Sequence, residues 1–105
     1  MSEPVVRISQ GFFDPVEAPK VSATLSEGRR VLEPVLKALP GLLHYYVSID
    51  ADSNSMVNVS IWESLEAARQ MDTLPEMLAQ RDVFVNLGVK FQPIRNYAGL
   101  WAIAP

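Results

Sequence analysis

Cysteine is absent from this 105-residue sequence, and histidine occurs once, as His44. Without cysteine the chain cannot form a disulfide framework, a thiolate nucleophile or a cysteine-ligated metal site. Since only one imidazole is available as well, we predict no metal site. A cysteine-free composition suits a reducing compartment, so we expect a cytoplasmic protein.

Clusters of basic residues and long apolar runs are also missing. The nine Lys and Arg and twelve Asp and Glu residues give a net charge of −3 and are spread along the chain, which disfavours a nucleic-acid partner. No apolar stretch approaches the roughly 18 residues that a membrane span requires, and residues 1–10 lack the basic-then-apolar order of a signal peptide. We therefore expect a soluble, unprocessed protein with no membrane partner.

Motifs of several large enzyme classes are absent too. The sequence contains no glycine-rich nucleotide loop, no HExxH metalloprotease motif and no GxSxG nucleophile elbow. The sequence therefore gives no indication of nucleotide binding or of hydrolase activity. What is present is an apolar fraction of 49%, which suits one domain with one core over residues 1–105.

The N-terminal half contains a strand pattern followed by a helix pattern. Val5–Phe13 is rich in β-branched and aromatic residues and ends before Pro15, which cannot continue a strand ladder. Leucine and valine then recur at helical spacing over 21–39. Gly28 and Pro34 lie inside that segment and predict a kink or a break in the helix.

The middle of the chain predicts a β-hairpin. Leu42–Asp50 and Met56–Trp62 are extended runs on either side of the polar segment 51–55. Ser64 is placed to cap a following helix that continues through Met71.

The C-terminal part predicts one more helix and one more strand. Residues 73–76 carry a capping-box pattern, the helix should end at Gly88, and a last strand should run over Arg95–Ile103. The resulting order β-α-β-β-α-β predicts an α+β, ferredoxin-like fold with a four-stranded antiparallel sheet and helices on one side.

Side-chain alternation gives the third strand two unlike faces. One row is aliphatic and consists of Val57, Val59 and Ile61. The other row carries an amide, a hydroxyl and an indole, on Asn58, Ser60 and Trp62. Because helices cover only one side of such a sheet, its other side would be an exposed apolar patch in a monomer, which predicts a homodimer through the sheet face.

Three short segments carry a family resemblance: LPGLL at 39–43, IWESLEAA at 61–68 and NYAGLW at 96–101. Together they make most of residues 5–103 resemble the antibiotic biosynthesis monooxygenase family. This resemblance implies a dimeric α/β barrel. Because related folds carry many chemistries, it implies the fold more strongly than any one reaction.

Quinone-forming members of that family oxidise reduced aromatic molecules with O₂ and without metal or flavin. The resemblance therefore implies a cofactor-independent monooxygenase acting on an aromatic or quinol-like small molecule. Asn58 and Trp62 match an asparagine and a tryptophan that such enzymes use. The tyrosine that they carry early in the next helix corresponds here to Ala68 or a neighbouring non-aromatic residue, so its proton-handling role has no match. We expect Arg69 and Arg81 to supply positive charge.

The residue types suggest further members of a site. His44 has the side chain best suited to a general base near neutral pH and shares a strand row with Tyr46. We predict Asn58, Trp62 and His44 as catalytic residues. The predicted substrate-binding residues are Tyr46, Ser60, Met71 and Arg81. The simpler alternatives are that Trp62 packs beneath a helix with its N–H bonded locally, and that His44 lies on the surface.

A second class of function stays open, namely a non-catalytic small-molecule-binding or stress-response barrel. The gap between sheet and helices distinguishes the two, because a gap filled by Tyr46, Trp62 and Met71 would leave no room for a ring system. Haem degradation also occurs in this fold but ranks lower. Its members resemble one another in having an iron-binding histidine on a helix where this chain has Met71 and Asp72.

Overall fold

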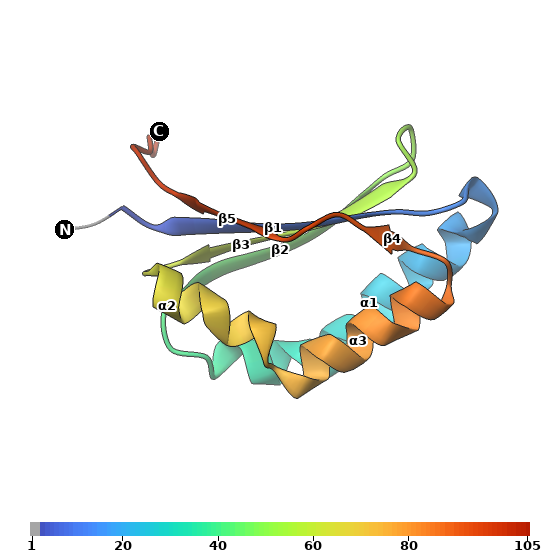
Figure 1. The fold of residues 1–105 in the computed structure, drawn as a ribbon, viewed down its shortest axis with the longest axis horizontal. Helices are drawn as coiled ribbons and strands as arrows, with labels where there is room; N and C mark the ends of the chain where they lie inside the picture. The colour runs from blue at the N-terminus through green and yellow to red at the C-terminus, as the bar shows by residue number, and fades with distance from the viewer. Residues whose placement is uncertain (1–2) are drawn as a thin grey trace.

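The structure is a computed structural model that describes residues 3–105. Helices cover one face of an antiparallel sheet, and the other face is open (Figure 1). The strands are β1 (Val5–Phe12), β2 (Leu42–Asp50), β3 (Ser55–Trp62), β4 (Lys90–Phe91) and β5 (Arg95–Ala98). The helices are α1 (Ala18–Lys37), α2 (Leu65–Ala68) and α3 (Pro75–Asn86), with short 3₁₀ turns η1 (Pro15–Glu17) and η2 (Arg69–Asp72). The predicted α+β, ferredoxin-like architecture is confirmed.

The sheet has the order β2-β3-β1-β4, and β5 pairs with β1 beside β4. The C-terminal segment thus contributes two short strands where we predicted one long strand up to Ile103, and that prediction is wrong. β5 ends where Ala98 pairs with Val5, at the start of β1. Beyond this pair the Gly99 N–H donates to the Pro4 carbonyl at 3.0 Å. Pro4, which precedes β1, has no N–H to return the bond, so the ladder ends there.

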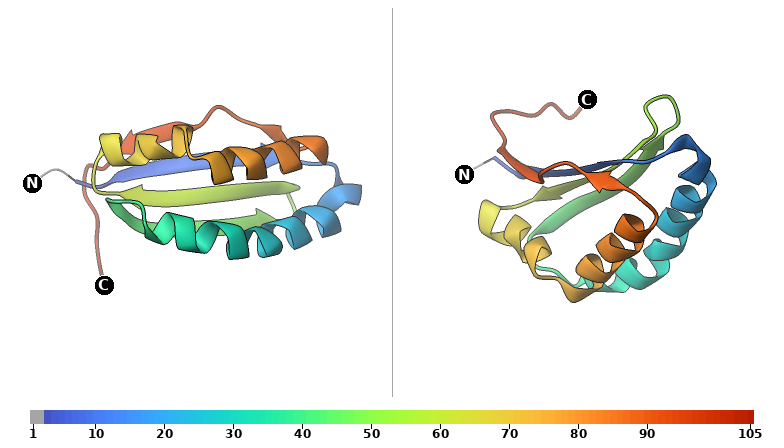
Figure 2. Two further views of the ribbon diagram at one scale, coloured as in Figure 1. Left: turned by 90° about the horizontal axis from the view of Figure 1, so that it is seen from below. Right: turned by 45° about the vertical axis from the view of Figure 1, so that its right-hand side comes forward.

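Helix α1 lies beneath β2 and β3, whereas α3 lies beneath β1 and the C-terminal strands (Figure 2). Of the predicted kink or break in the first helix, the break is wrong, because α1 continues through Gly28 and Pro34 to Lys37. The kink stays a prediction. Gly28 is buried, and a Cβ there would lie 3.0 Å from the side-chain oxygen of Gln80 on α3. Glycine at this position therefore serves the close approach of two helices.

The predicted helix starts are partly confirmed. The Ser64 hydroxyl accepts a hydrogen bond from the Ala67 N–H at 3.1 Å and caps α2, which passes into η2 after four residues. The capping box predicted at 73–76 does not form, because Leu74 occupies the N-cap and no side chain bonds there. α3 ends at Asn86, and Gly88 follows with φ of +90°, as its predicted role as a stop requires.

The core lies between sheet and helices as two separate clusters of buried residues. The first consists of Val5, Leu36, Trp62, Ala68 and Met71. The second consists of Phe13, Val21, Met56, Phe84 and Val89. Met56 and Trp62 are at opposite ends of one row on β3, so the two clusters lie at opposite ends of the sheet, and the polar residues Asn58 and Ser60 fall between them.

A β-bulge between Leu42 and His44 decides which residues of β2 face the helices. Leu42 pairs with Trp62, but His44 already pairs with Ile61, so Leu43 is an extra residue in β2. A shift of one residue turns every following side chain to the opposite face. Tyr45, Val47 and Ile49 therefore share the helix-facing side with Ser60, Asn58 and Met56.

Across residues 3–105, α1 is the longest helix, and neither it nor any other described helix is long and apolar enough to cross a membrane.

Two glycines with positive φ allow the effect of backbone strain to be separated from that of crowding. Gly41 has φ of +84°, and a Cβ there would lie 2.7 Å from the Cβ of Ala67, whereas Gly88 has φ of +90° and open space around it. We expect Gly88→Ala to lower the free energy of unfolding by roughly 1 kcal/mol and Gly41→Ala by roughly 2–4 kcal/mol. Urea denaturation measures both. Equal losses for the two variants would show that contact with Ala67 adds nothing.

Candidate functional site

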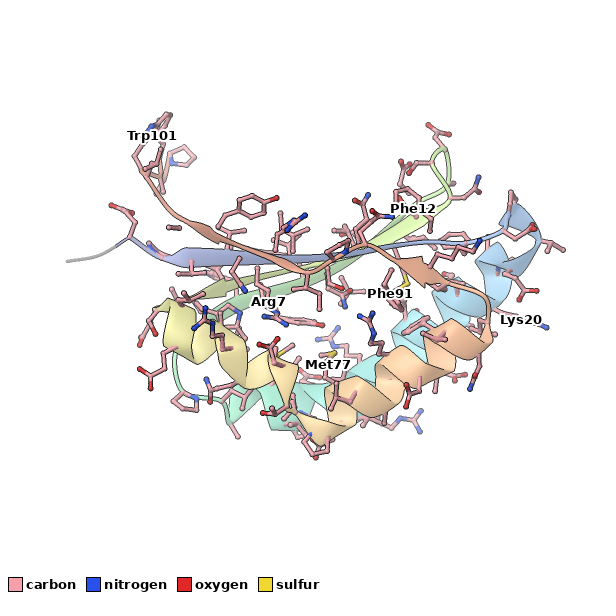
Figure 3. All side chains as sticks on the ribbon, in the orientation of Figure 1. Arg7, Phe12, Lys20, Met77, Phe91 and Trp101 are labelled. Carbon is pink, nitrogen blue, oxygen red and sulfur yellow. The ribbon has the colours of Figure 1, made fainter. Side chains whose placement is uncertain are left out.

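A cavity of about 1230 Å³ lies between the sheet and the helices. β1, β2, β3, α1, η2 and α3 all contribute lining residues. Figure 3 shows Arg7 and Phe91 projecting from the sheet toward the helices and Met77 lying across from them. Ligand pockets usually measure about 300–1000 Å³, so the gap has room for a multi-ring molecule and is not filled by the core side chains.

The sheet side of the cavity is a polar surface built by strand pairing. One rung across three strands consists of Tyr45, Ser60 and Arg7, because Ser60 pairs with both neighbours. The next rung places Ser9 beside Asn58. All five residues line the cavity. We call this set, Arg7, Ser9, Tyr45, Asn58 and Ser60, the polar floor.

Two groups on the polar floor are buried without a hydrogen-bond partner among residues 3–105. They are the Oδ1 of Asn58 and the hydroxyl of Tyr45. Burial raises the pKa of Tyr45 to about 12, and the positive charge of Arg7 opposes that shift. Tyr45 is therefore a neutral phenol at physiological pH and can either donate or accept a hydrogen bond. Buried polar groups that face a cavity and lack partners are typical of a ligand site.

Arg7 places a positive charge on the polar floor. Its side chain is 5% exposed, its Nη2 donates to Asp72 Oδ1 at 2.7 Å, and its Nη1 donates to Asn96 Oδ1 at 3.3 Å. Asp72, on η2, is 55% exposed. The ion pair thus joins a buried cation on the sheet to a carboxylate at the rim of the cavity.

Trp62 lies next to the cavity and not on its wall. The side chain is fully buried in the first core cluster, and its Nε1–H donates to the Ser60 hydroxyl at 2.8 Å. The indole N–H therefore has a hydrogen-bond partner on the same strand. This matches the simpler alternative, in which Trp62 packs beneath a helix and is not a catalytic residue. Its direct contribution to the site is to orient Ser60.

His44 and Tyr46 lie on the open face of the sheet, where they pair with Ile61 and Val59. Their rings are stacked with centroids 6.0 Å apart. The structure does not bring them together with Asn58, contrary to the predicted site, because the bulge at Leu43 turns their side chains away from the helices. Without that bulge, His44 would have paired with Ser60.

The other predicted residues reach the cavity. Ser60, Met71 and Arg81 line it, and Arg69 is not among the lining residues. The Arg81 guanidinium lies 4.5 Å from the centroid of the Phe91 ring, a cation–π arrangement that holds it against the cavity wall.

Sequence reasoning missed Arg7, Tyr45, Asp72 and Asn96. A signal for Arg7 was present, because the alternation of the first strand puts Arg7 and Ser9 in one row with the buried Val5. An arginine on the inward row of a strand indicates a partner or a ligand. Tyr45 offered no such signal, since only the bulge determines its face.

Metal ligands do not gather at this site. Over the part of the chain that the structure describes, no group of three or more His, Asp or Glu side chains is placed to hold an ion.

Stability at alkaline pH should depend on the buried phenol of Tyr45. Since the pKa of Tyr45 is raised from 10 to about 12 in the folded state, the unfolded chain loses this proton first as the pH rises. The stability contributed by the protonated phenol is complete below pH 10 and is lost between pH 10 and 12, by up to about 2–3 kcal/mol. We expect Tyr45→Phe to flatten this alkaline slope in urea denaturation at pH 8 and pH 11. Tyr46→Phe, at an exposed position, is the control, and an equal flattening there would refute the role of burial.

Comparison with known proteins gives the same architecture. The sequence model of the antibiotic biosynthesis monooxygenase family matches residues 9–82. No curated protein sequence matches the chain.

Solved structures similar to this chain include a proposed antibiotic biosynthesis monooxygenase from Deinococcus radiodurans (20% identity, 96% of this chain and 97% of that chain covered, TM-score 0.75). Rv0793 from Mycobacterium tuberculosis is similar as well (21% identity, 97% and 100% covered, TM-score 0.71). So is SnoaB, a cofactor-independent oxygenase from Streptomyces nogalater, in a mutant form (14% identity, 99% and 100% covered, TM-score 0.69). At these identities the likeness shows a shared fold.

Proposed function

The chain belongs to the antibiotic biosynthesis monooxygenase family, and we propose that it oxidises a hydroxylated aromatic molecule with O₂ in its cavity, without metal or flavin. The observation that carries the proposal is the pair of unpartnered groups on the polar floor, Asn58 Oδ1 and the Tyr45 hydroxyl. A phenolic substrate supplies what both groups lack, a donor for the amide oxygen and an oxygen atom for the tyrosine O–H. SnoaB, which has the same fold, is a cofactor-independent oxygenase.

The chemistry follows from positioning an electron-rich ring. A phenol that donates a hydrogen bond to Asn58 Oδ1 has a more electron-rich ring, which favours electron transfer to O₂, and the protons that leave the substrate end on the reduced oxygen. Oxidation of a ring CH₂ group to C=O removes four electrons. One oxygen atom of O₂ becomes the carbonyl oxygen, and the other leaves as water. The protein orients the ring, supports the oxygen substituents and limits the access of water.

The cavity provides walls for this role. Leu25 and Leu32 of α1, Met77 and Phe84 of α3, and Met71 line the side opposite the polar floor. An aromatic ring held between these apolar side chains and the polar floor would bury its edges and direct its hydroxyl groups toward the sheet.

Oxidation should depend on the polar floor. Purified protein incubated in air with anthrone-like or naphthol-like compounds, without added cofactor, should form quinone faster than buffer does. We expect Asn58→Ala and Tyr45→Phe each to lower kcat/KM by roughly tenfold to a hundredfold, because each removes one bond to a substrate oxygen. O₂ consumption and quinone absorbance are the measurements. Asn86→Ala, at an exposed asparagine at the end of α3, is the matched control. Rates equal to buffer across the panel would rule out the oxygenase.

A second candidate function is binding without turnover. Ala68, where quinone-forming relatives would carry a tyrosine by the sequence resemblance, is fully buried in the core. His44 faces away from the cavity, so no imidazole is available there to take a proton. A binding protein would show ligand-dependent thermal stabilisation with no O₂ consumption.

We also propose that two copies associate through the open face of the sheet. Apolar side chains of β1 and β3 share that face, among them Val6, Ile8, Val57, Val59 and Ile61. The C-terminal residues after β5 extend on the same side, with Trp101 labelled in Figure 3 and 75% exposed. Their strand-like sequence has no partner strand among the described residues 3–105, and a second copy would supply one.

A charge at the centre of that face should separate the copies. We expect Val59→Lys to shift the molar mass from dimer to monomer in analytical ultracentrifugation, because a buried lysine without a partner is costly. Val31→Lys places the same change on the exposed surface of α1 and is the control. A wild-type protein that sediments as a monomer would contradict the proposed dimer.

A further inference from the structure

We propose that the cavity selects aromatic molecules that carry a carboxylate, and that Arg7 binds this carboxylate in exchange for Asp72. The inference rests on the proposed function for the location of the site, and it adds a substrate class and a selecting residue.

Charge distribution is the first observation. The chain has a net charge of −3, yet more cations than anions line the cavity. The cationic lining residues are Arg7, Arg29, Lys37 and Arg81. The acidic ones are Glu33 and Asp72. A cavity whose charge is opposite in sign to that of the whole protein favours an anionic ligand.

The asymmetry of the Arg7 ion pair is the second observation. Arg7 is 5% exposed and Asp72 is 55% exposed. Water can solvate Asp72 when it leaves, so its departure costs little, whereas the buried guanidinium must keep a negative partner. A ligand carboxylate entering the cavity supplies such a partner. Asp72 is thus a replaceable counter-ion that keeps Arg7 satisfied in the empty protein.

The unused donors of Arg7 are the third observation. A guanidinium has five N–H donors in a planar fork that fits a carboxylate with two parallel hydrogen bonds. Among residues 3–105, only Asp72 and Asn96 accept from it, and the bond to Asn96 is long at 3.3 Å. Arg7 lines the cavity, so its remaining donors are available to a ligand.

The register of the polar floor then defines where the substituents of the ligand lie. Arg7 and Tyr45 belong to one rung, and Asn58 belongs to the next rung. Neighbouring rungs on one face are roughly 7 Å apart along the strands, which is about the length of a fused two-ring system. A carboxylate at Arg7 with a hydroxyl within reach of Tyr45 or Asn58 describes a hydroxylated aromatic acid.

Arg81 is the other residue that could anchor the ligand carboxylate, in competition with Arg7. It also lines the cavity, and no described carboxylate forms an ion pair with it. Its exposed position and its stacking on Phe91 place it at the wall, where solvent screens its charge. The two anchors predict different outcomes for the same experiment.

The experiment compares 6-hydroxy-2-naphthoate, whose hydroxyl and carboxylate lie at opposite ends of the two rings, with 2-naphthol, which lacks only the carboxylate. Titration calorimetry under anaerobic conditions gives both Kd values without turnover. We expect wild type to bind the naphthoate roughly tenfold to a hundredfold more tightly, as a charge-assisted bidentate pair provides. Arg7→Met should reduce this ratio to near one. Asp72→Asn should strengthen naphthoate binding about threefold to tenfold, because it removes the competing charge.

Three controls make the result decisive. Arg30→Met removes the same charge from an exposed site on α1 that does not line the cavity, and it should keep the wild-type ratio. If Arg81→Met abolishes the ratio and Arg7→Met keeps it, Arg7 is not the anchor. If Arg7→Met does not fold, Asp72→Asn decides alone, and unchanged or weaker naphthoate binding in that variant overturns the proposal.

Failure of this proposal and failure of the proposed function can be told apart. A carboxylate preference that Arg7→Met removes, without quinone formation in air, would support Arg7 as the anchor and refute the oxygenase. Oxidation of neutral naphthols with no preference for the acid would support the oxygenase and refute Arg7 as the anchor.

Discussion

The pairing of β2 with β3, fixed by one extra residue at Leu43, is the constraint on which the site depends. The bulge turns Tyr45 toward the helices and turns His44 and Tyr46 toward the open face. With the alternative register His44 would pair with Ser60 and Tyr46 with Asn58, so both would face the cavity in place of Tyr45. One residue therefore decides whether the polar floor contains an imidazole and which tyrosine it presents.

The cavity exists because the core is divided. Met56 and Trp62 anchor apolar clusters at the two ends of β3, and the helices rest on these clusters. Between them, Asn58 and Ser60 provide no apolar surface for a helix to cover. Ser60 gains a partner from the Trp62 indole, but Asn58 Oδ1 does not gain one. Stability is thus concentrated at the ends of the sheet, and unsatisfied polar groups remain in the middle, which is the usual distribution for a binding site.

The sequence was sufficient for the strand and helix order and for the two faces of β3, because these follow from side-chain periodicity and turn residues. It was sufficient for Asn58, Ser60, Met71 and Arg81 as cavity residues, since each lies on an inward row of its element. It was not sufficient for His44, Tyr45 and Tyr46, because local propensity does not reveal a bulge. The end of β5 could not be predicted either, since it depends on Pro4 near the other end of the chain, which accepts from the Gly99 N–H but has no N–H to return the bond.

A buried arginine with a replaceable partner has consequences for both affinity and selectivity. The empty protein needs Asp72, because an unpaired guanidinium at 5% exposure would be strongly destabilising. Any carboxylate ligand must therefore compete with a carboxylate already tethered nearby at high effective concentration, which limits its affinity. A neutral ligand that displaced Asp72 would leave the charge uncompensated, whereas one that left the pair intact would gain nothing from Arg7. Selectivity thus arises from the cost of leaving Arg7 unpaired as well as from the bonds that it forms.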